Sequence, residues 1–475
     1  MALQSDGDIV MLGVLNPDAE DASIVLVRYR LDGRIDQSFG SGGIVEVPLP
    51  YRSSAGGIET QTDGKILIAG GMYMPATNSY TGLVARLLPN GALDPSFGTG
   101  GYLTVDFGGY SFIRHVRTLP DGRIVAVGVL NGTLALARLL SDGTFDESFG
   151  QHGISLVEGS GSPLWGKELT GVALQVDGTM IGSAASSTSM QVAKLTADGR
   201  PDVSFGEGGI ARVYVDFCNG SASSDIAQRV AVRPSGRIVV AGASHSFCTP
   251  SGTRLVLMQF LADGEVDSSF GVNGRALAQV GQWSSIVGLS LDIDGSICVG
   301  ATIGVDETHT QFAVVRFLPG GLLDASYGTS GAVYADFAEP DVGATSFAVQ
   351  QDGRLIVGGA VSNDGVGIAR FPRPTPPTYD YCIQGDHTGD LVQVNVPYGA
   401  YTQTNCASGN VTSGHAVATT VGRCKVRLTS DDSIRMKITV NDCRGRAKGT
   451  INDVVTGAKI RIDDDNLSDD SCGCR

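Results

Sequence analysis

The chain has 475 residues, of which 42% are apolar, 17% are charged and 66 are glycine, and its formal net charge is −15. This length is too great for one compact core, so we expect two domains, or one repetitive domain with an added module. The composition suits short buried strands joined by tight turns better than it suits helices. The acidic balance argues against nucleic acid as a partner, because proteins that bind phosphate backbones concentrate Lys and Arg.

The first seven residues (MALQSDG) lack both the basic and the apolar region of a signal peptide. This sequence instead predicts the end of a strand followed by a turn, so we expect the chain to begin inside a repeat. No stretch of 18 apolar residues occurs in the sequence, and no membrane span is therefore predicted.

From Asp6 onward, a turn followed by an apolar run recurs at intervals of 56 to 59 residues. The seven copies are DGDIVML from Asp6, DGKILIA from Asp63, DGRIVAV from Asp121, DGTMIGS from Asp177, SGRIVVA from Ser235, DGSICVG from Asp294 and DGRLIVG from Asp352. Asp-Gly supplies the positive φ that hairpin turns need, and continuous apolar runs of this length are typical of strands buried on both faces. The period indicates a repeat architecture of about 58 residues per unit.

A second pattern, G-x-x-D-x-S-F/Y-G, lies between these turns. Its six copies occupy residues 31–43, 88–101, 140–153, 195–209, 261–274 and 318–331, and the seventh unit stops at Phe371 before reaching it. Each unit resolves into four short strands, as in 111–118, 124–127, 134–140 and 154–157. The last unit therefore lacks the segment for its fourth strand.

Four strands per unit, repeated seven times, predict an all-β fold, a seven-bladed β-propeller of four-stranded blades. An open solenoid is the rival architecture, but radial closure removes the exposed edges that an open array would present. How the ring closes stays open at this point. One arrangement would have the first residues and the last unit share a blade.

The combination of DG-[KR]-I-V-x-x-G with a downstream R-x-L-x-x-x-G-x-x-D-x-S-F-G-x-x-G resembles the delta-60 repeat family over residues 1 to about 372. The resemblance implies a β-propeller in a bacterial secreted or surface protein, and it implies little about activity. The chain departs from the pattern where Ser235 replaces the turn aspartate, and where Thr179 and Ser296 replace the basic residue.

The recurring residues are interpreted as structural, as is usual for repeats. Each loop aspartate is expected to accept hydrogen bonds from turn amides and to pair with the basic or amide side chain upstream of it. The aspartates are Asp36, Asp94, Asp146, Asp202, Asp267 and Asp324; the upstream residues are Arg28, Arg86, Arg138, Lys194, Gln259 and Arg316, with Arg370 in the last unit. The aromatic residues expected to fill gaps between blades are Phe39, Phe97, Phe149, Phe205, Phe270 and Tyr327.

After the last repeat, residues 373–379 are expected to form a proline-rich linker. In residues 380–475, apolar and polar residues alternate, as in strands with one face exposed to solvent. Six cysteines fall there: Cys382, Cys406, Cys424, Cys443, Cys472 and Cys474. Their density predicts a small disulfide-rich β-sandwich from an oxidising compartment, of no family that we recognise, with a role in attachment or in capping the ring. A zinc site is the weaker interpretation. Cys218 and Cys248 are candidates for a further disulfide, and Cys298 is expected to be a buried thiol.

No catalytic motif is visible. The six histidines follow no ligand spacing, no G-x-S-x-G elbow occurs, and no repeat aspartate has the spacing of a calcium loop. We therefore predict a protein that is not an enzyme and that holds no metal or cofactor. A hydrolase or lyase site assembled at the axis from distant blades remains the alternative, because sequence spacing cannot exclude it.

A ligand-binding face is indicated by the loops that vary between units. The connections after the second strand differ in length and content, and they emerge on the same side as the connections that cross between blades. Aromatic residues precede the turns at matched offsets of 11 or 12 residues in four of these crossings: Tyr51, Tyr110, Trp165 and Trp283. Such residues recognise carbohydrate or protein when exposed, but they could instead seal the channel mouth or pack between blades. The sequence thus predicts a monomeric, extracellular or cell-surface scaffold that binds a glycan or a protein through this face.

Overall fold

The computed structural model of the chain consists of 35 β-strands, with no helix among the described residues. It describes residues 1–372 except for 132, 158–167, 176, 186–188, 214–223, 247–251, 293, 307, 338, 340–341 and 362–364. Between residues 379 and 462 it describes the backbone of eight further strands. In the described part of the chain, no helix has the length and hydropathy that a membrane span requires.

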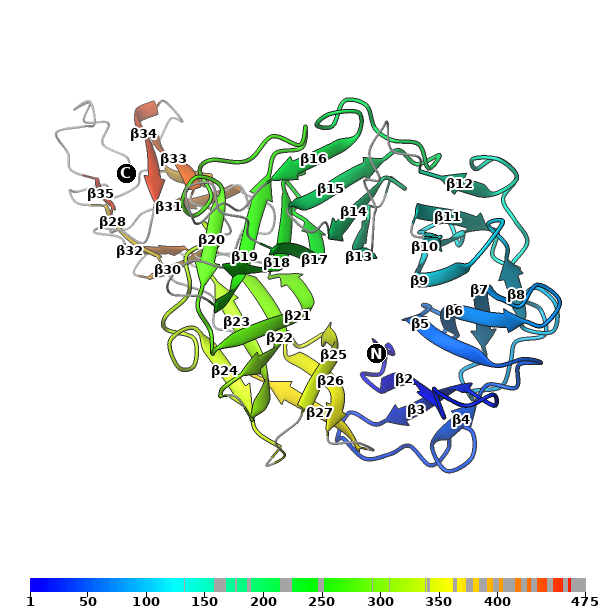
Figure 1. Cartoon of the computed structure of the whole chain (residues 1–475). Helices are drawn as coiled ribbons and strands as arrows, with labels where there is room; N and C mark the ends of the chain where they lie inside the picture. The colour runs from blue at the N-terminus through cyan, green and yellow to red at the C-terminus, as the bar shows by residue number, and fades with distance from the viewer. Residues whose placement is uncertain are drawn as a thin grey trace.

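The first 27 strands form seven antiparallel sheets, which are arranged as the blades of a ring (Figure 1). Blades 1 to 3 consist of β1 (Ala2–Leu3), β2 (Ile9–Leu15), β3 (Ser23–Tyr29) and β4 (Ile44–Glu46); β5 (Ser53–Thr60), β6 (Ile66–Met74), β7 (Ser79–Leu87) and β8 (Tyr102–Val105); and β9 (Ser111–Thr118), β10 (Ile124–Leu130), β11 (Thr133–Leu139) and β12 (Ile154–Leu156). Blades 4 and 5 consist of β13 (Glu168–Leu174), β14 (Met180–Ala185), β15 (Met190–Leu195) and β16 (Ile210–Val213); and β17 (Ser224–Val232), β18 (Ile238–Ser246), β19 (Gly252–Phe260) and β20 (Arg275–Ala278). Blades 6 and 7 consist of β21 (Trp283–Leu291), β22 (Ile297–Gly304), β23 (Thr310–Phe317) and β24 (Ala332–Ala335); and β25 (Val342–Val349), β26 (Leu355–Val361) and β27 (Gly365–Phe371). The predicted seven-bladed propeller is confirmed; among the described residues, six blades have four strands and blade 7 has three.

Within each blade, consecutive strands pair as antiparallel neighbours, from the innermost strand to the rim. The Asp-Gly turns join the first and second strands; in blade 2, Gly64 adopts φ +83°, a conformation that glycine takes without strain. The ion pair between Lys65 in this turn and Asp94 in the loop before the fourth strand (3.4 Å) places both connections on one face of the ring. The variable loops and the crossings between blades lie on the other face.

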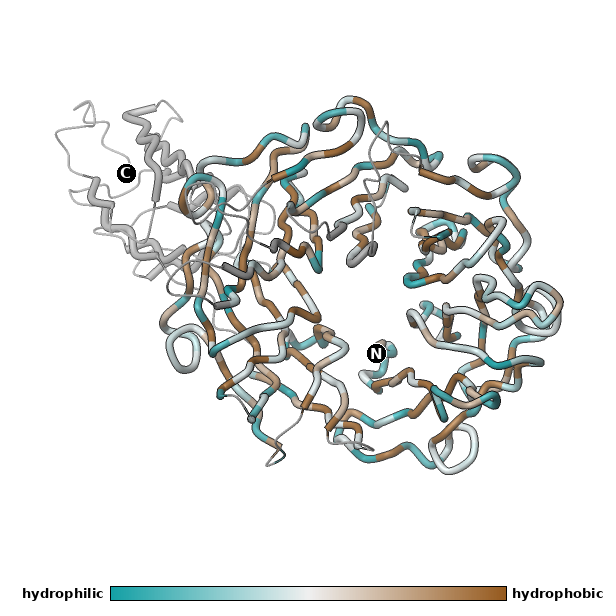
Figure 2. The backbone as a smooth tube through the Cα atoms, in the orientation of Figure 1, coloured by the Kyte–Doolittle hydropathy of each residue, from teal (hydrophilic) through white to brown (hydrophobic). Residues whose placement is uncertain are grey.

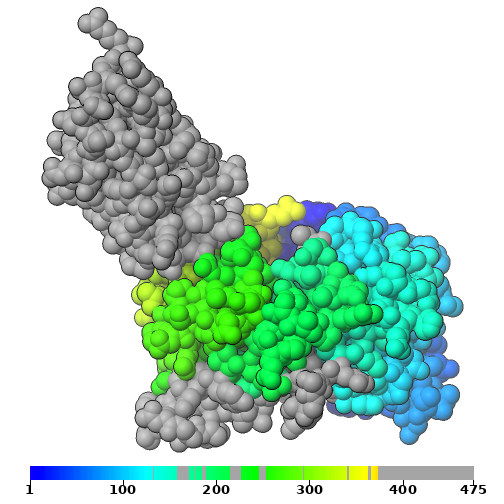
Figure 3. Space-filling view, turned by 90° about the horizontal axis from the view of Figure 1, so that it is seen from above, coloured from blue at the N-terminus to red at the C-terminus, as the bar shows by residue number. Residues whose placement is uncertain are grey.

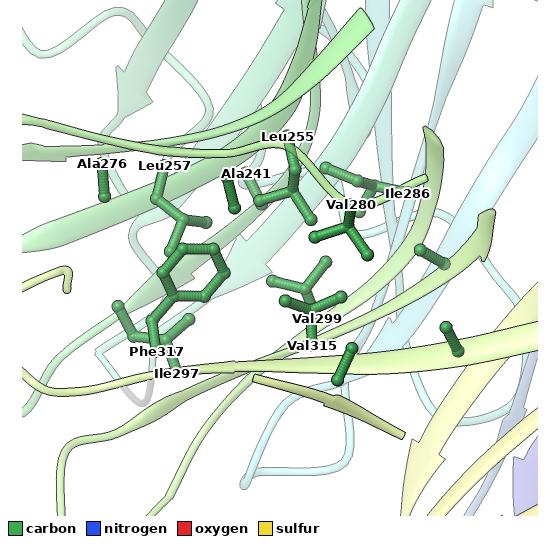
Figure 4. Packing of buried hydrophobic residues seen from close by; sticks show 14 of the residues in the cluster. Ala241, Leu255, Leu257, Ala276, Val280, Ile286, Ile297, Val299, Val315 and Phe317 are labelled. Atoms are coloured by element: carbon green, nitrogen blue, oxygen red, sulfur yellow. The ribbon is translucent and has the colours of Figure 1, made fainter. Parts of the chain in front are cut away.

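Neighbouring blades pack face to face, which explains why the second and third strands are continuously apolar. Between blades 5 and 6, Leu255 and Leu257 of β19 meet Val299 and Val315, all of them fully buried (Figure 4). Hydrophobic stretches run along the strands of every blade in the same way (Figure 2). Each strand is therefore covered by protein on both sides, as expected for strands of this pattern.

The ring closes between blades 7 and 1 without a shared blade. β1 pairs with β2 inside blade 1, and β25, β26 and β27 form their own three-stranded sheet. The two blades meet through a small apolar cluster in which Ile356 packs with Ile9 and Met11. The last and first blades also lie side by side in the space-filling view (Figure 3). The arrangement in which the first residues complete the last blade is therefore wrong for this structure.

The C-terminal strands form two further four-stranded sheets, ordered β30-β32-β28-β35 and β31-β29-β33-β34. They are β28 (Tyr379–Ile383), β29 (Leu391–Asn395), β30 (Tyr401–Thr404), β31 (His415–Thr419), β32 (Lys425–Leu428), β33 (Ile434–Asn441), β34 (Ala447–Val455) and β35 (Ile460–Ile462). The described part of this region consists of strands. The sandwich packing, the domain boundaries and the disulfides remain predictions, since the side chains of all eight candidate cysteines lie outside the described part of the chain.

Candidate functional site

Three of the four predicted loop aromatics are exposed on the variable-loop face. Tyr51 lies two residues before the innermost strand β5 of blade 2, and Tyr110 lies directly before the innermost strand β9 of blade 3. Trp283 is the first residue of β21, the innermost strand of blade 6. Their exposed fractions are 45%, 50% and 40%. The fourth, Trp165, lies outside the described residues.

Tyr110 belongs to a row of three tyrosine rings in edge-to-face contact at the boundary of blades 2 and 3. Its ring meets that of Tyr80 edge to face, with centroids 6.2 Å apart, and Tyr80 in turn meets Tyr73 at 5.8 Å. Tyr73 and Tyr80 stand opposite each other on β6 and β7, next to the variable loop. The guanidinium of Arg52 lies 4.0 Å from the centre of the Tyr73 ring, which is a favourable cation–π geometry.

Next to this row lies a groove of about 770 Å³ between blades 1 and 2. Its lining includes the carboxylates Glu20, Asp21 and Glu46 of blade 1. The lining also includes Pro48, Leu49, Pro50, Tyr51, Arg52, Tyr73 and Pro75, from the crossing to blade 2 and from blade 2 itself. The groove is within the size range of ligand sites, and its lining mixes charged, aromatic and apolar side chains.

The polar groups of the groove differ in how they are engaged. Glu46 accepts a hydrogen bond from the Ser23 hydroxyl (2.7 Å) and Asp21 accepts one from the Asn16 amide (3.5 Å), and all three carboxylates are exposed. The Arg52 guanidinium lies over the ring of Tyr73, and its buried Nε has no hydrogen-bond partner among the described residues. The groove can therefore offer an aromatic face and several acceptors to one ligand.

The structure brings Tyr51 and Tyr110 to the same sector of the face, but not Trp283, which belongs to blade 6. Its indole lies over Gly304, the residue paired with it on β22. Sequence reasoning missed Arg52, Tyr73 and Tyr80. The available signal was the variable loop of blade 2, which has a tyrosine on each side of its turn.

A second cluster lines the inner strands near the axis. A β-bulge in β9 places Arg114 beside His115, and a matching bulge in β17 places Gln228 beside Arg229. Burial lowers the pKa of His115 to about 3, and Arg117, Arg229 and Arg114 add to this shift by repulsion. His115 is therefore neutral at neutral pH and too weakly basic to act as a general base there.

The recurring aspartates form a network on the opposite face. Asp94 accepts a hydrogen bond from the Ser96 amide (3.0 Å) and another from Arg86 Nε (2.8 Å). The same arrangement recurs from blade to blade, with Lys194 and Gln259 replacing the arginine in blades 4 and 5. Arg370 of blade 7 has no such aspartate in its own unit and donates to the carbonyl of Leu31 in blade 1. These contacts hold loops in place and leave the aspartates little capacity for a ligand.

Within the described residues, no three His, Cys, Asp or Glu side chains gather as a metal site would require. Cys298 is a free thiol buried in β22, and burial raises its pKa to about 12.

The repeats match a family of β-propeller domains of unknown function, DUF5122, over residues 61–97, 119–149 and 233–270. No curated protein matches the chain. Among solved structures, a Dyadobacter fermentans protein of unknown function is 12% identical with a TM-score of 0.40, and covers 78% of this chain and 92% of its own. A Lactobacillus plantarum protein is 13% identical, covers 70% of this chain and 87% of its own, and has a TM-score of 0.41. Drosophila Semaphorin 2a is 10% identical, covers 96% of this chain and 97% of its own, and has a TM-score of 0.44.

Likenesses as distant as these carry no argument about function, because propellers serve many unrelated activities. The family match and the ring of sheets agree on the architecture: the chain is a seven-bladed β-propeller whose repeats match, in three segments, a propeller family of unknown function.

Proposed function

We propose that the chain is a non-catalytic recognition scaffold that binds a glycan or a protein through its variable-loop face. The observation that carries the proposal is the groove between blades 1 and 2, with the exposed ring of Tyr51 at its wall and the row of tyrosines beside it. A suitable ligand presents an apolar face to the rings and hydroxyl or cationic groups to the carboxylates. A rigid ring that carries such groups on loops is a typical recognition device.

We further infer that the repeats are of the delta-60 type and that the protein is bacterial, secreted or displayed on a cell surface, and monomeric. The repeat patterns and the cysteine-rich C-terminal region support this inference. That region would attach the propeller to a surface or cap its ring.

A hydrolase or lyase site at the axis is the alternative function. The axial cluster is the feature that would carry it, yet His115 has a pKa of about 3, which is unsuited to proton transfer at neutral pH. The axial groups therefore support this alternative less well than the groove supports recognition.

The proposal is tested by screening the purified chain on a glycan array and against extracellular proteins. For any ligand found, Tyr51→Ala and Tyr110→Ala should each weaken binding about tenfold or more, since exposed aromatic anchors dominate such interfaces. The triple variant Tyr110→Ala, Trp165→Ala, Trp283→Ala tests the wider face. Tyr334→Ala is the matched control, because this tyrosine is also exposed (38%) but lies on the fourth strand of blade 6.

Unchanged binding by all aromatic variants, in chains that still unfold cooperatively, would rule out this face. Turnover of a bound glycan or release of product would favour the axial alternative instead.

A further inference from the structure

The groove between blades 1 and 2 carries uncompensated negative charge. Glu20, Asp21 and Glu46 line it, all three are exposed, and none of them has an ion-pair partner among the described residues. Arg52 is the one basic residue of the described lining, so three carboxylates against one guanidinium leave a formal charge of −2. Such a lining attracts a cationic group and repels an acidic one, such as the carboxylate of an acidic glycan.

The side chains of the groove offer many hydrogen-bond acceptors and few donors. Two hydroxyl groups are already engaged, because Ser23 donates to Glu46 (2.7 Å) and Tyr73 donates to Asn78. The lining also contains three residues that have no amide hydrogen to donate: Pro48, Pro50 and Pro75. A sugar hydroxyl both donates and accepts, whereas the ammonium of lysine and the guanidinium of arginine only donate. The groove therefore suits a basic side chain better than a neutral glycan.

The ring of Tyr51 provides a free aromatic face in the groove. It is 45% exposed, and no other ring or cation stacks on it among the described residues. The neighbouring Arg52 shows how this surface holds a guanidinium: its Cζ lies 4.0 Å from the ring centre of Tyr73 and 5.7 Å from that of Tyr80. A ligand arginine can stack on Tyr51 in the same way and place its nitrogen atoms among the acceptors of the groove.

Arg52 offers donors for the backbone of such a ligand. Its side chain makes no hydrogen bond or ion pair with the described residues, although its Nε is buried. A peptide carries a backbone carbonyl beside every side chain, so one segment can donate to the carboxylates and also accept from Arg52. A simple polyamine carries only donors and would leave Arg52 unmatched.

The groove is open because of how blades 1 and 2 are built. Its lining lies within residues 20–75, and every residue of these two blades is described, so no undescribed segment of either blade is missing from it. A second copy of this chain is a poor occupant, because its own net charge is −15 and two copies repel each other. A basic segment of another protein has the charge that the groove lacks.

We propose that the groove binds a basic, extended peptide segment of another protein. An arginine of the segment stacks on Tyr51 and donates to the three carboxylates, and a backbone carbonyl accepts from Arg52. The inference rests on the proposed recognition function and narrows its ligand from a glycan or a protein to a basic peptide.

The probe is a fluorescent nonapeptide, GSRARARSG, titrated against the full chain; its alternate arginines lie on one side of an extended backbone. We expect saturable one-to-one binding that weakens about tenfold or more between about 20 and 300 mM salt, because salt screens exposed charges. A peptide with citrulline in place of arginine keeps the planar side chain but loses the charge, and it should bind about tenfold more weakly. A lysine peptide should bind more weakly than the arginine peptide, since an ammonium group has no plane to stack.

Variants of the groove test each contact on the side of the protein. Glu20→Gln and Asp21→Asn should each weaken binding about threefold, and both together about tenfold, because each removes a charge and keeps the size of the side chain. Tyr51→Ala should weaken binding about tenfold, whereas Tyr51→Phe, which keeps the ring, should leave it nearly unchanged. Glu207→Gln is the matched control, because this glutamate is also exposed but lies in the loop before the fourth strand of blade 4, on the opposite face.

A folded chain that does not bind the arginine peptide, or that binds the arginine and citrulline peptides equally, would overturn the inference. Binding that the groove variants leave unchanged would do the same. Carboxyl-to-amine cross-links between the groove and lysines of the same chain, which excess peptide does not displace, would show that the chain's own residues fill the groove and would also overturn it.

A neutral glycan and a glucosamine oligosaccharide, titrated in parallel, separate this inference from the function on which it rests. If either sugar binds in a manner that Tyr51→Ala abolishes while the arginine peptide does not bind, the groove is a carbohydrate site, so the inference fails and the proposed function stands. If no glycan, protein or peptide ligand depends on Tyr51, both fail.

Discussion

Phe97 of blade 2 lies so close to Gly143 of blade 3 that a Cβ on this glycine would be 2.9 Å from the aromatic ring. The contact links two consecutive repeats, and it relies on two recurring features of the loops, the aromatic side chain of one repeat and the glycine, without a side chain, of the next. Gly143 also has φ +88°, in the region that L-residues adopt only with strain.

The first prediction compares two loop glycines that share a backbone conformation. Gly33→Ala should cost about 1 to 2 kcal/mol of unfolding free energy, since φ is +85° but the surrounding space is open. Gly143→Ala should cost about 2 to 5 kcal/mol, because it adds a steric clash with Phe97 to the same strain. Urea denaturation of both variants measures the difference. Equal losses would show that the Phe97 contact is loose in solution.

The second prediction concerns Arg316, whose guanidinium is fully buried in blade 6. It binds Asp294 at 2.8 Å and also donates to Asp324. Arg316→Ala should lower the free energy of unfolding by about 3 to 5 kcal/mol, because it leaves buried carboxylates without their cation. Arg34→Ala is the control: this arginine is 86% exposed, and its loss should change stability by less than about 0.5 kcal/mol. A small effect of Arg316→Ala would mean that water replaces the guanidinium.

The third prediction concerns acid. Burial by itself would raise the pKa of Asp94, but hydrogen bonds from Ser96 and Arg86 outweigh it and lower this pKa to about 2. Because the folded-state pKa is the lower one, the stabilisation is fully present above about pH 4, the range of an unfolded aspartate, and is lost as the pH falls towards about 2. Asp94→Asn should therefore be less stable than the parent chain at pH 6 and approach it near pH 2. Thermal melts across this range test the prediction, and a stability difference that does not change with pH would contradict it.

The fourth prediction concerns the thiol of Cys298. It is 1% exposed, and burial raises its pKa to about 12, so very little reactive thiolate is present at pH 8. An alkylating reagent should leave Cys298 unmodified in the native chain and modify it fully in urea. Mass spectrometry of the peptide that contains Cys298 separates it from the other cysteines. Rapid modification under native conditions would show that β22 opens locally.

Particular residues show how far the sequence predicts the fold and the candidate site. The spacing of Asp63 and Asp121 reports the blade period, because each blade must repeat the same turn to present the same faces to its neighbours. The exposure of Tyr51 and Tyr110 was left open by the sequence, since a loop aromatic can point outward or seal the ring. The part played by Tyr73 and Tyr80 could not be predicted, because their stacking with Tyr110 joins two blades.

The sequence by itself determined the number of blades, the strands and the turns, because these follow from local chemistry: apolar runs, glycines at positive φ and a fixed period. Only the tertiary structure decided how the ring closes: in the part of the chain that it describes, the first and last blades remain separate sheets that meet through Ile356, Ile9 and Met11. The physical reason is that closure depends on contacts between the first and last repeats, more than 300 residues apart, which no local pattern encodes.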